Sequence, residues 1–248
     1  MKDKKQWVFG RHPVIEAIKA EQSVEKVWLQ QGTRGAFEKE LRHLCKHHQI
    51  PVTILPKERL NKLVKGNHQG VIALLAAASY QNLEDIIPFV YEQSQTPLFL
   101  LLDGVTDVRN FGAVARSAEL CGAQAIIIPA KGSAGLTAEA LKTSAGALSR
   151  IPVCRVKSLV STIAYLQESG IQVFASDLSG DTLLHELDLK SPMAFVLGSE
   201  GEGISRGVAK AADMCFKIPQ LGTINSFNVS VAAGIMLYEC MKKRLWKI

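Results

Sequence analysis

Cysteine is scarce in this sequence, and its spacing offers no familiar cysteine-based site. The five residues are scattered: Cys45, Cys121, Cys154, Cys215 and Cys240. The sequence has no Cys-x-x-Cys pair and no cysteine–histidine ligand spacing, which are the patterns of zinc sites and redox motifs. An odd number of cysteines also does not fit a disulfide framework. We therefore expect reduced, mostly buried thiols and no bound metal, as in a cytoplasmic protein.

Long apolar stretches are also missing. No run approaches the roughly 20 residues that a membrane-spanning helix needs, and the polar start MKDKKQW has no signal-peptide pattern. With 47% hydrophobic and 21% charged residues over 248 positions, the composition is that of a soluble globular protein of one or two domains. We expect a cytoplasmic protein with no membrane partner.

Positive charge, by contrast, is concentrated at one end of the chain. Residues 1–70 hold 14 lysine and arginine residues against 7 acidic ones, whereas the remainder holds 15 against 16. Five of the six histidines also lie in this first part. A basic module attached to a neutral core suggests a polyanionic partner such as a nucleic acid. A solvated lysine-rich surface would give the same counts, and charge alone does not separate the two.

Residues 1–78 predict a small α/β domain. Pro13 stands where the first turn of a helix tolerates proline, and the apolar residues of 36–48 recur at helical spacing. The expected elements are helices over 13–20, over 36–48 and after Pro56, and strands over 24–29, 52–55 and 71–76. His68-Gln69-Gly70, just before the last strand, is rich in hydrogen-bonding groups, although Gly70 alone would explain a turn there.

Residues 79–96 are interpreted as a linker with a short helix, and from residue 97 strands alternate with helices. The segment 98–103, LFLLLD, is apolar almost throughout, as expected for a strand of a parallel sheet covered on both faces. Further strands are expected over 125–128, 153–156, 172–175, 194–197 and 215–218, and helices over 113–121, 137–147, 159–169, 205–212 and from 229 onward. This alternation predicts a doubly wound parallel α/β domain over 97–248.

In such sheets, ligands bind beyond the carboxyl ends of the strands, and this rule selects three loops. The first runs from Asp103 to a helix that Asn110 and Gly112 are expected to open, with Asn110 as a candidate N-cap. Arg116 follows among small residues, where a guanidinium is expected to meet a carboxylate or a phosphate. An internal ion pair with Asp103 or Asp107 is the simpler alternative.

The second loop, Gly198–Gly203, follows an apolar strand and has the order G-x-x-G-x-G. Nicotinamide enzymes carry G-x-G-x-x-G instead, and no P-loop lysine is present. Glu200 and Glu202 would also repel a pyrophosphate. A nicotinamide oxidoreductase is therefore disfavoured, and the glycines are better explained by a tight backbone turn against a ligand.

The third loop precedes a helix that starts with small, uncharged residues. Its polar and small residues are Gly222, Thr223, Asn225, Ser226, Asn228 and Ser230. The free N–H groups at the start of such a helix suit an anion or a ribose-like ligand. Ordinary helix capping explains the loop equally well.

Together, the three loops resemble the three motifs of the SpoU (TrmH) family of RNA ribose 2′-O-methyltransferases. The matching blocks are N-x-G-x-x-x-R within 103–123, G-S-E-G-E-G within 197–205, and I-P…S-F-N-V-S-V-A-A-G within 218–239. Val108 stands where the family usually has proline, and Phe227 where it usually has leucine. Neither departure removes a reactive group.

The amino-terminal part resembles the RNA-binding module that precedes many members of this family. The matching stretches are G-R-H-P-V-I-E-A and N-H-Q-G-V, within residues 7–76, and the module is similar to the L30e/L7Ae ribosomal fold. The subgroup that the chain resembles most is the bacterial enzyme that methylates a guanosine ribose in 23S rRNA.

The resemblance implies a catalytic domain with a deep trefoil knot, S-adenosylmethionine as cofactor and a homodimer with the site near its interface. The implied cofactor pocket consists of Leu197, Gly198, Gly203, Ile218, Phe227 and Asn228. The implied catalytic and RNA-contacting set consists of Asn110, Arg116, Glu200, Ser226 and Asn228. Arg116 is the family's proposed proton acceptor. Because an arginine side chain has a pKa of roughly 12 or higher, a phosphate clamp is at least as good a role.

Two other functions stand beside methylation of a 23S rRNA guanosine. One is a tRNA ribose 2′-O-methyltransferase with the same chemistry, although members that act on tRNA often lack the amino-terminal module. The other is a non-catalytic RNA-binding protein built on the same scaffold. The presence of all five polar motif residues disfavours the latter.

Overall fold

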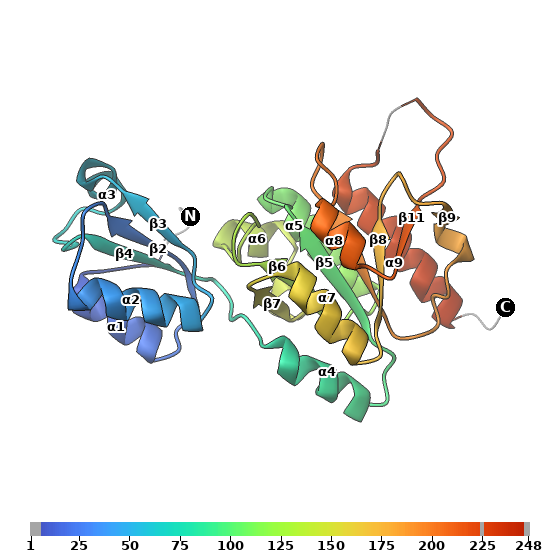
Figure 1. Cartoon of the computed structure of the whole chain (residues 1–248), viewed down its shortest axis with the longest axis horizontal. Coiled ribbons are helices and arrows are strands. Elements are labelled where there is room, and N and C mark those ends of the chain that lie inside the picture. Colours follow the sequence, from blue (N-terminus) through green and yellow to red (C-terminus); the bar gives the residue numbers. More distant parts are fainter. Residues whose placement is uncertain (1–5, 224–225, 246–248) are drawn as a thin grey trace. The chain divides into compact units, whose positions relative to one another are not determined.

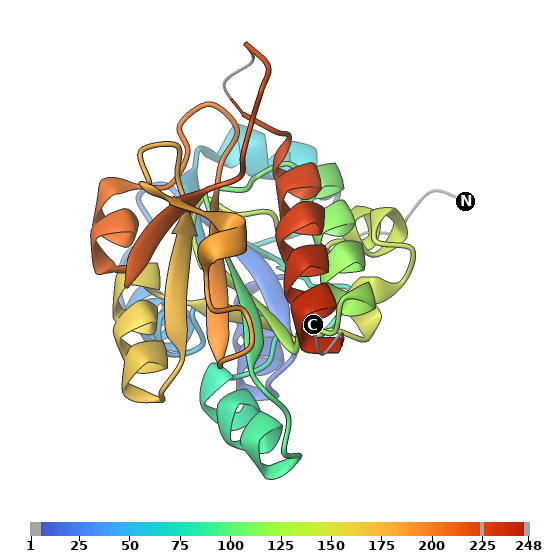
Figure 2. The ribbon, with the colours of Figure 1, turned by 90° about the vertical axis from the view of Figure 1, so that its right-hand side faces the viewer.

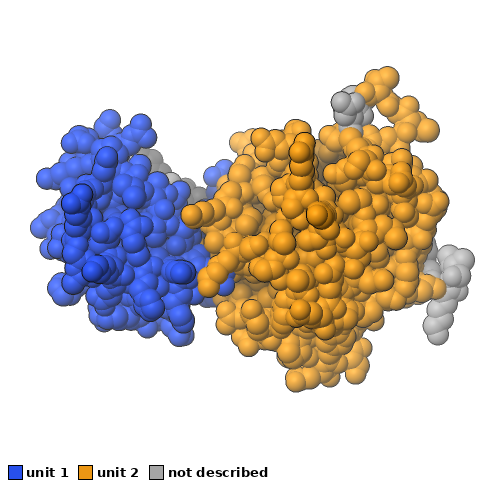
Figure 3. Space-filling model, viewed as in Figure 1, with its two compact units in different colours: residues 1–79, 135–139 blue, residues 80–134, 140–248 orange. Residues whose placement is uncertain are grey.

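The computed structural model describes residues 6–223 and 226–245. The chain forms two compact units (Figure 3), one made of residues 1–79 with 135–139 and the other of residues 80–134 with 140–248. In the described part of the chain, every helix is too short or too polar to cross a lipid bilayer.

The first unit is built on a four-stranded sheet in the order β1-β4-β2-β3 (Figure 1). Its strands are β1 (Trp7–Phe9), β2 (Val24–Gln30), β3 (Val52–Leu55) and β4 (Val71–Leu75), and its helices are α1 (Arg11–Lys19), α2 (Ala36–His47) and α3 (Lys57–Leu63). Strand β4 is antiparallel to both β1 and β2, whereas β2 and β3 are parallel. The three helices and the last three strands match the sequence prediction. Strand β1 was missed, because three residues are too few to show alternation.

Helices cover both faces of this small sheet. Val14 and Ile18 of α1 and Leu41 of α2 pack against Val27 and other residues of one face. Leu60 of α3 packs with Ile72 and the two strand tryptophans on the other face. The basic residues that distinguish this part of the sequence are therefore left at its surface.

The second unit contains a seven-stranded sheet in the order β7-β6-β5-β10-β8-β11-β9, and every pairing in it is parallel. The strands are β5 (Leu98–Asp103), β6 (Ala125–Pro129), β7 (Val153–Val156), β8 (Gln172–Ser176), β9 (Thr182–Leu183), β10 (Met193–Gly198) and β11 (Met214–Lys217). The helices are α4 (Leu83–Glu92), α5 (Val108–Leu120), α6 (Ala138–Thr143), α7 (Leu159–Glu168), α8 (Arg206–Ala211) and α9 (Val229–Leu245), with 3₁₀ turns η1 (Ala147–Ser149) and η2 (Leu184–Glu186).

Helices lie on both faces of this sheet too, as the sequence predicts for a doubly wound fold. Buried residues of α4, α7 and α8 share one core cluster with Phe99 and Leu101 of β5. Figure 2 shows α9 beside α5 on the other side of the sheet. Strand order reverses between β5 and β10, which makes the carboxyl ends of these two strands the expected position of a ligand.

Two helices of this unit differ from their predicted bounds. Helix α5 begins five residues earlier than expected, because Asp107 is its N-cap and accepts hydrogen bonds from the backbone N–H groups of Arg109 and Asn110. The prediction that Asn110 caps this helix was therefore wrong. The helix expected over 137–147 is only α6 followed by η1, since Ala145 and Gly146 adopt positive φ and interrupt it.

The five cysteines are all free, and Cys45, Cys154 and Cys240 are buried. Burial raises the pKa of the Cys154 thiol to about 12 and that of the Cys240 thiol to about 11. These are the reduced, mostly buried thiols that the sequence predicts.

Candidate active site

Three loops that are far apart in the sequence meet through one carboxylate. Glu200 Oε1 accepts a hydrogen bond of 3.0 Å from Asn110 Nδ2 and another from Asn228 Nδ2. Asn228 Nδ2 also lies 3.1 Å from Asn110 Oδ1. This Asn110–Glu200–Asn228 triangle joins the first turn of α5, the loop after β10 and the start of α9. The sequence prediction that the three loops converge is confirmed.

Capping interactions at the starts of α5 and α9 orient the side-chain amides of Asn110 and Asn228. The Asp107 cap places Asn110 in the first turn of α5, so its side chain is free to point at Glu200. Asn228 Oδ1 accepts from the backbone N–H of Ser230 at 2.9 Å and from its hydroxyl at 2.6 Å, which is an N-cap interaction for α9. Because its oxygen is engaged in this way, the nitrogen of Asn228 must face the carboxylate. The Asn228 carboxamide thus caps α9 with its oxygen and bonds to the site with its nitrogen.

The loop after β10 is a tight turn that requires glycine. A Cβ on Gly198 would lie 2.1 Å from the backbone carbon of Gly203, and Gly201 and Gly203 have φ of +92° and +70°. Ser199 and Gly203 close the turn with two mutual backbone hydrogen bonds of 3.1 and 3.0 Å. The backbone of Ser205 donates to Asp103 Oδ2 at 2.8 Å, which fastens the loop to the end of β5.

A cavity of about 470 Å³ opens beside the triangle. It is lined by five of the six residues predicted for a cofactor pocket, Leu197, Gly198, Gly203, Ile218 and Phe227, together with Glu200 and Ser226. Asn228, the sixth, lies between the lining residues Phe227 and Val229 without lining the cavity itself. Ile218 is buried, whereas Phe227 is 40% exposed. Asn225 lies outside the described residues.

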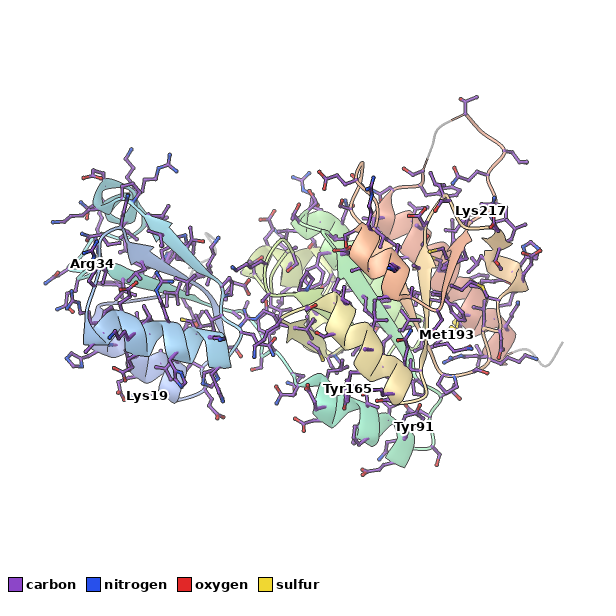
Figure 4. All side chains as sticks on the ribbon, in the orientation of Figure 1. Lys19, Arg34, Tyr91, Tyr165, Met193 and Lys217 are labelled. Carbon is purple, nitrogen blue, oxygen red and sulfur yellow. The ribbon has the colours of Figure 1, made fainter. Side chains whose placement is uncertain are left out.

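The cavity has lining residues that the sequence analysis missed. Ser176, Asp177 and Leu178 come from the end of β8, and Lys217 from the end of β11 (Figure 4). The loop after β8 has no glycine pattern, but the carboxyl-end rule applies to it as well and could have found it. Asp177, Glu200 and Glu202 give the lining three carboxylates against one ammonium group.

Arg116 is not part of the triangle or of the cavity lining. Its side chain on α5 is exposed, and within residues 6–223 and 226–245 it makes no hydrogen bond or ion pair. Asp103 accepts from Ser205 and Asp107 caps α5, so the alternative of an internal pair with either aspartate was wrong. A free guanidinium on the surface is available to an external anion.

In the described part of the chain, no group of three or more histidine, cysteine, aspartate and glutamate side chains could hold a metal ion. The arrangement therefore offers hydrogen-bond donors and acceptors and a partly apolar cavity for its chemistry.

Two family models match the chain, and together they cover most of it. Residues 97–238 match the SpoU rRNA Methylase family. Residues 7–81 match the model described as RNA 2′-O ribose methyltransferase substrate binding.

Individual relatives agree with these matches. The Bacillus subtilis protein YacO, whose name places it in the TrmH family of tRNA/rRNA methyltransferases, is 36% identical over 244 residues, which is 98% of each chain. A TrmH-family structure from Porphyromonas gingivalis is 28% identical, with a TM-score of 0.57 over 96% of this chain and 89% of that one. The SpoU methyltransferase AviRb from Streptomyces viridochromogenes, solved in complex with the cofactor AdoMet, shares the fold at a TM-score of 0.61 and 22% identity, over 97% and 91% of the two chains.

Proposed function

Because the chain belongs to the SpoU rRNA methylase family of S-adenosylmethionine-dependent RNA 2′-O-methyltransferases, we propose that it methylates the ribose of a guanosine in 23S rRNA. The Asn110–Glu200–Asn228 triangle supports the methyl-transfer part of this proposal, since it holds a carboxylate in the lining of the cavity in which a methyl donor would bind. The basic first unit, matched by the substrate-binding model, supports a large structured RNA.

The residues of the cavity fit S-adenosylmethionine. Its volume of about 470 Å³ lies in the range of small-molecule sites, and the side chains of Leu197, Ile218 and Phe227 suit an adenine ring. The three lining carboxylates, which would repel a pyrophosphate, suit a ligand that carries a sulfonium and an ammonium group. When bound, the cofactor supplies an activated methyl group, which no side chain provides.

In this proposal, Glu200 orients the ribose hydroxyl. Both amide donors of the triangle bond to Oε1, so Oε2 is free among the described residues to accept a hydrogen bond from the 2′-hydroxyl. Holding this oxygen in place lowers the entropic cost of aligning the hydroxyl for attack. Arg116 binds the phosphate next to the target ribose and does not take the proton, because a guanidinium is a poor base. The hydroxyl proton passes to Glu200 Oε2 as the ribose oxygen takes up the methyl group.

We also propose that two copies of the chain assemble through α5 and α9. These adjacent helices expose apolar side chains, namely Leu120 at 68%, Val231 at 49% and Tyr238 at 50%. An exposed apolar area of this kind marks an interaction surface, and Arg116 lies one turn before Leu120 on α5. A second copy there would bring its own surface close to Arg116. Sedimentation equilibrium tests this point, and a monomer at micromolar concentration would contradict it.

Methylation of tRNA is the second candidate, because relatives such as YacO are named for both tRNA and rRNA. The match of the first unit to a substrate-binding model supports rRNA. With either substrate, we propose that the protein acts in the cytoplasm. Mapping of 2′-O-methylation in total RNA, from cells with and without the gene, separates these functions. We expect one guanosine of 23S rRNA to lose its methyl group without the protein.

Other results of this experiment would change the proposal. A change confined to tRNA would replace it by the second candidate. No change in any RNA, together with no heat of S-adenosylmethionine binding in calorimetry, would favour a non-catalytic RNA-binding protein.

A further inference from the structure

The first unit contains a larger cavity, of about 680 Å³, for which the proposed chemistry has no use. It is lined by Arg11, His12, Gln30, Lys57, Asn61, Gly66, Asn67, His68, Gln69 and Gly70. These residues come from the start of α1, the end of β2, α3 and the loop before β4. The two stretches that the sequence analysis singled out, around Arg11 and around His68, therefore meet at one cavity.

The loop before β4 is built to hold a fixed shape. Gln69 adopts a φ of +50° and Gly70 a φ of +82°. The side-chain oxygen of Gln69 accepts from the backbone N–H of Arg11 at 3.1 Å, and its backbone oxygen accepts from Arg11 Nε at 3.4 Å. The loop and the start of α1 are thus tied together across 58 positions of sequence.

His68 stabilises this arrangement from inside. It is only 4% exposed, and its Nδ1 accepts a hydrogen bond of 3.0 Å from the backbone N–H of Gly70. Nδ1 is therefore unprotonated, so Nε2 carries the hydrogen and donates to Asn61 Oδ1 at 2.8 Å. With its oxygen engaged, Asn61 presents its NH₂ group outward. His68 is a structural residue of the cavity, whereas the lining side chains of Arg11, Lys57 and Asn67 are exposed.

The positive charge of the cavity lining favours an anionic ligand. Arg11 and Lys57 contribute two permanent positive charges, and no described lining residue is acidic. The guanidinium of Arg11 lies 5.1 Å from the ring centre of Phe37, a cation–π contact that holds it in place. Arg34, labelled in Figure 4, adds an exposed positive charge four residues after the lining residue Gln30.

Around these charges the lining provides amides. Gln30, Asn61, Asn67 and Gln69 each carry a carboxamide, a group that can donate and accept at the same time, as the edge of a nucleobase does. The described lining has no phenylalanine, tyrosine or tryptophan, and of its two histidine rings that of His68 is buried. The four carboxamides therefore favour reading of a base by its edge. Unpaired nucleotides expose that edge, whereas paired ones in an A-form helix hide it in a deep, narrow groove.

We propose that this cavity binds one unpaired nucleotide of the substrate RNA, with Arg11 and Lys57 on its phosphates and the carboxamides of Asn61 and Asn67 on its base. This inference rests on the proposed function, because it takes the substrate to be RNA. The first unit then recognises a single-stranded element of the RNA, at a site separate from the residues that carry the methyl transfer.

The binding measurements use the full chain without a methyl donor, and a separate methylation assay is run with the donor. Binding is measured by fluorescence anisotropy with a 23S rRNA transcript, a 12-nucleotide single-stranded RNA and the same RNA as a duplex, at several salt concentrations. Lys57→Ala removes an exposed charge of the cavity, and Lys46→Ala removes an exposed charge of α2 outside it. Asn67→Ala removes an exposed carboxamide, with no change in charge.

We expect Lys57→Ala to weaken binding of the single strand about tenfold and to reduce the slope of log K against log salt by about 1, as the loss of one phosphate contact does. Lys46→Ala leaves both unchanged. Asn67→Ala weakens binding of the single strand without changing the salt slope, and it leaves duplex binding unchanged. In the methylation assay, Lys57→Ala raises KM at an unchanged kcat.

Two negative results are distinguishable. If the protein methylates RNA but Lys57→Ala and Lys46→Ala bind it equally well, only the nucleotide site is wrong. If the unmodified chain binds none of the three RNAs, the nucleotide site and the proposed function both fail. Unchanged circular dichroism spectra of the variants show that neither result comes from misfolding.

Discussion

At the scale of single residues, Glu200 connects the chemistry to the fold. Its carboxylate holds two amides from helix starts that lie 118 positions apart in the sequence. The sequence motif brought Asn110, Glu200 and Asn228 together as a set, but it could not say what each one contacts. The contact of Asn110 with Glu200, for example, depends on Asp107. Because Asp107 caps α5, the Asn110 side chain is not needed as the cap and can bond to the site.

Replacement of Glu200 by glutamine separates its role in holding the two asparagines from its proposed role in accepting the ribose hydroxyl. The carboxamide oxygen of Glu200→Gln still accepts from both asparagines, so the thermal midpoint and the affinity for S-adenosylmethionine stay close to normal. The NH₂ group that takes the place of Oε2 cannot accept the ribose hydroxyl, and we expect the rate of methyl transfer to fall by about 10²-fold or more. Single-turnover methylation measures this. A matched control is Glu168→Gln, at the exposed end of α7, and equal activity in both variants would contradict the assigned role.

Arg116 is the second residue whose role can be tested. Arg116→Ala removes an exposed guanidinium that makes no hydrogen bond or ion pair among the described residues, so we expect unchanged stability and unchanged cofactor affinity. Methyl transfer should fall by about 10²-fold, the usual loss for a removed electrostatic contact at a reacting centre. Calorimetry and a methylation assay measure the two properties. Arg150→Ala, which removes an arginine with a 77% exposed side chain from the same unit, serves as control, and normal turnover in Arg116→Ala would refute the assignment.

The buried thiols give a prediction on pH. Burial raises the pKa of the Cys154 thiol to about 12 from an ordinary value of 9.0, so the folded protein holds it neutral. We expect Cys154 to resist iodoacetamide at pH 8, as measured by mass spectrometry of the intact and the unfolded chain. Because the folded pKa is raised, the stabilisation is complete below pH 9 and is lost as the pH rises toward 12. Rapid labelling of Cys154 in the folded protein at pH 8 would show that the core opens there.

At the scale of elements, the loop after β10 depends on close backbone packing. A methyl group on Gly198 meets backbone atoms of Gly203 and Ile204 at 2.1 to 2.3 Å, and backbone cannot move aside cheaply. We expect Gly198→Ala to lower the thermal midpoint and to weaken S-adenosylmethionine binding at least tenfold.

The matched control for this substitution is Gly207→Ala in α8, where the nearest side-chain atom lies 3.7 Å from the new Cβ. It should be neutral or slightly stabilising, since alanine favours a helix by up to about 1 kcal/mol over glycine. Differential scanning calorimetry compares the two variants. A Gly198→Ala protein as stable as Gly207→Ala would mean that the loop relaxes easily.

Elements differed in how well the sequence predicted them. Strand β5 was predicted with correct bounds, because LFLLLD has five consecutive apolar residues, and all five are buried in the structure. Strand β9 has two residues, which no period can reveal. Asp177 and Lys217 were missed as cavity residues. The carboxyl-end rule could have selected their loops, but which of those loops lie beside β10 depends on the order of strands in the sheet, which single-residue patterns do not encode.

At the scale of the whole molecule, the core of the second unit begins before the predicted catalytic domain at residue 97. Leu83 and Ile87 of α4 are 3% and 4% exposed within that core, and the backbone N–H of Gln81 donates to Val153 at 2.9 Å. Residues 80–248 should therefore fold, bind S-adenosylmethionine normally and lose most of their affinity for RNA along with the basic first unit.

A shorter piece, residues 90–248, should be less stable than residues 80–248. Each lost core side chain removes roughly 1.5–3 kcal/mol of burial, and about 1 kcal/mol corresponds to 2–4 °C in a domain of this size. We expect a thermal midpoint lower by about 10 °C in scanning calorimetry. Equal midpoints for the two pieces would show that α4 is dispensable.

The triangle also limits how this sequence can change over generations. Replacing Asn110 or Asn228 alone by aspartate would set a second carboxylate against Glu200, and replacing either by leucine would leave that carboxylate short of a donor. At Asn228, leucine would also remove the N-cap of α9. Because replacing Glu200 itself is expected to slow methyl transfer, we expect these three positions to change together and not one at a time.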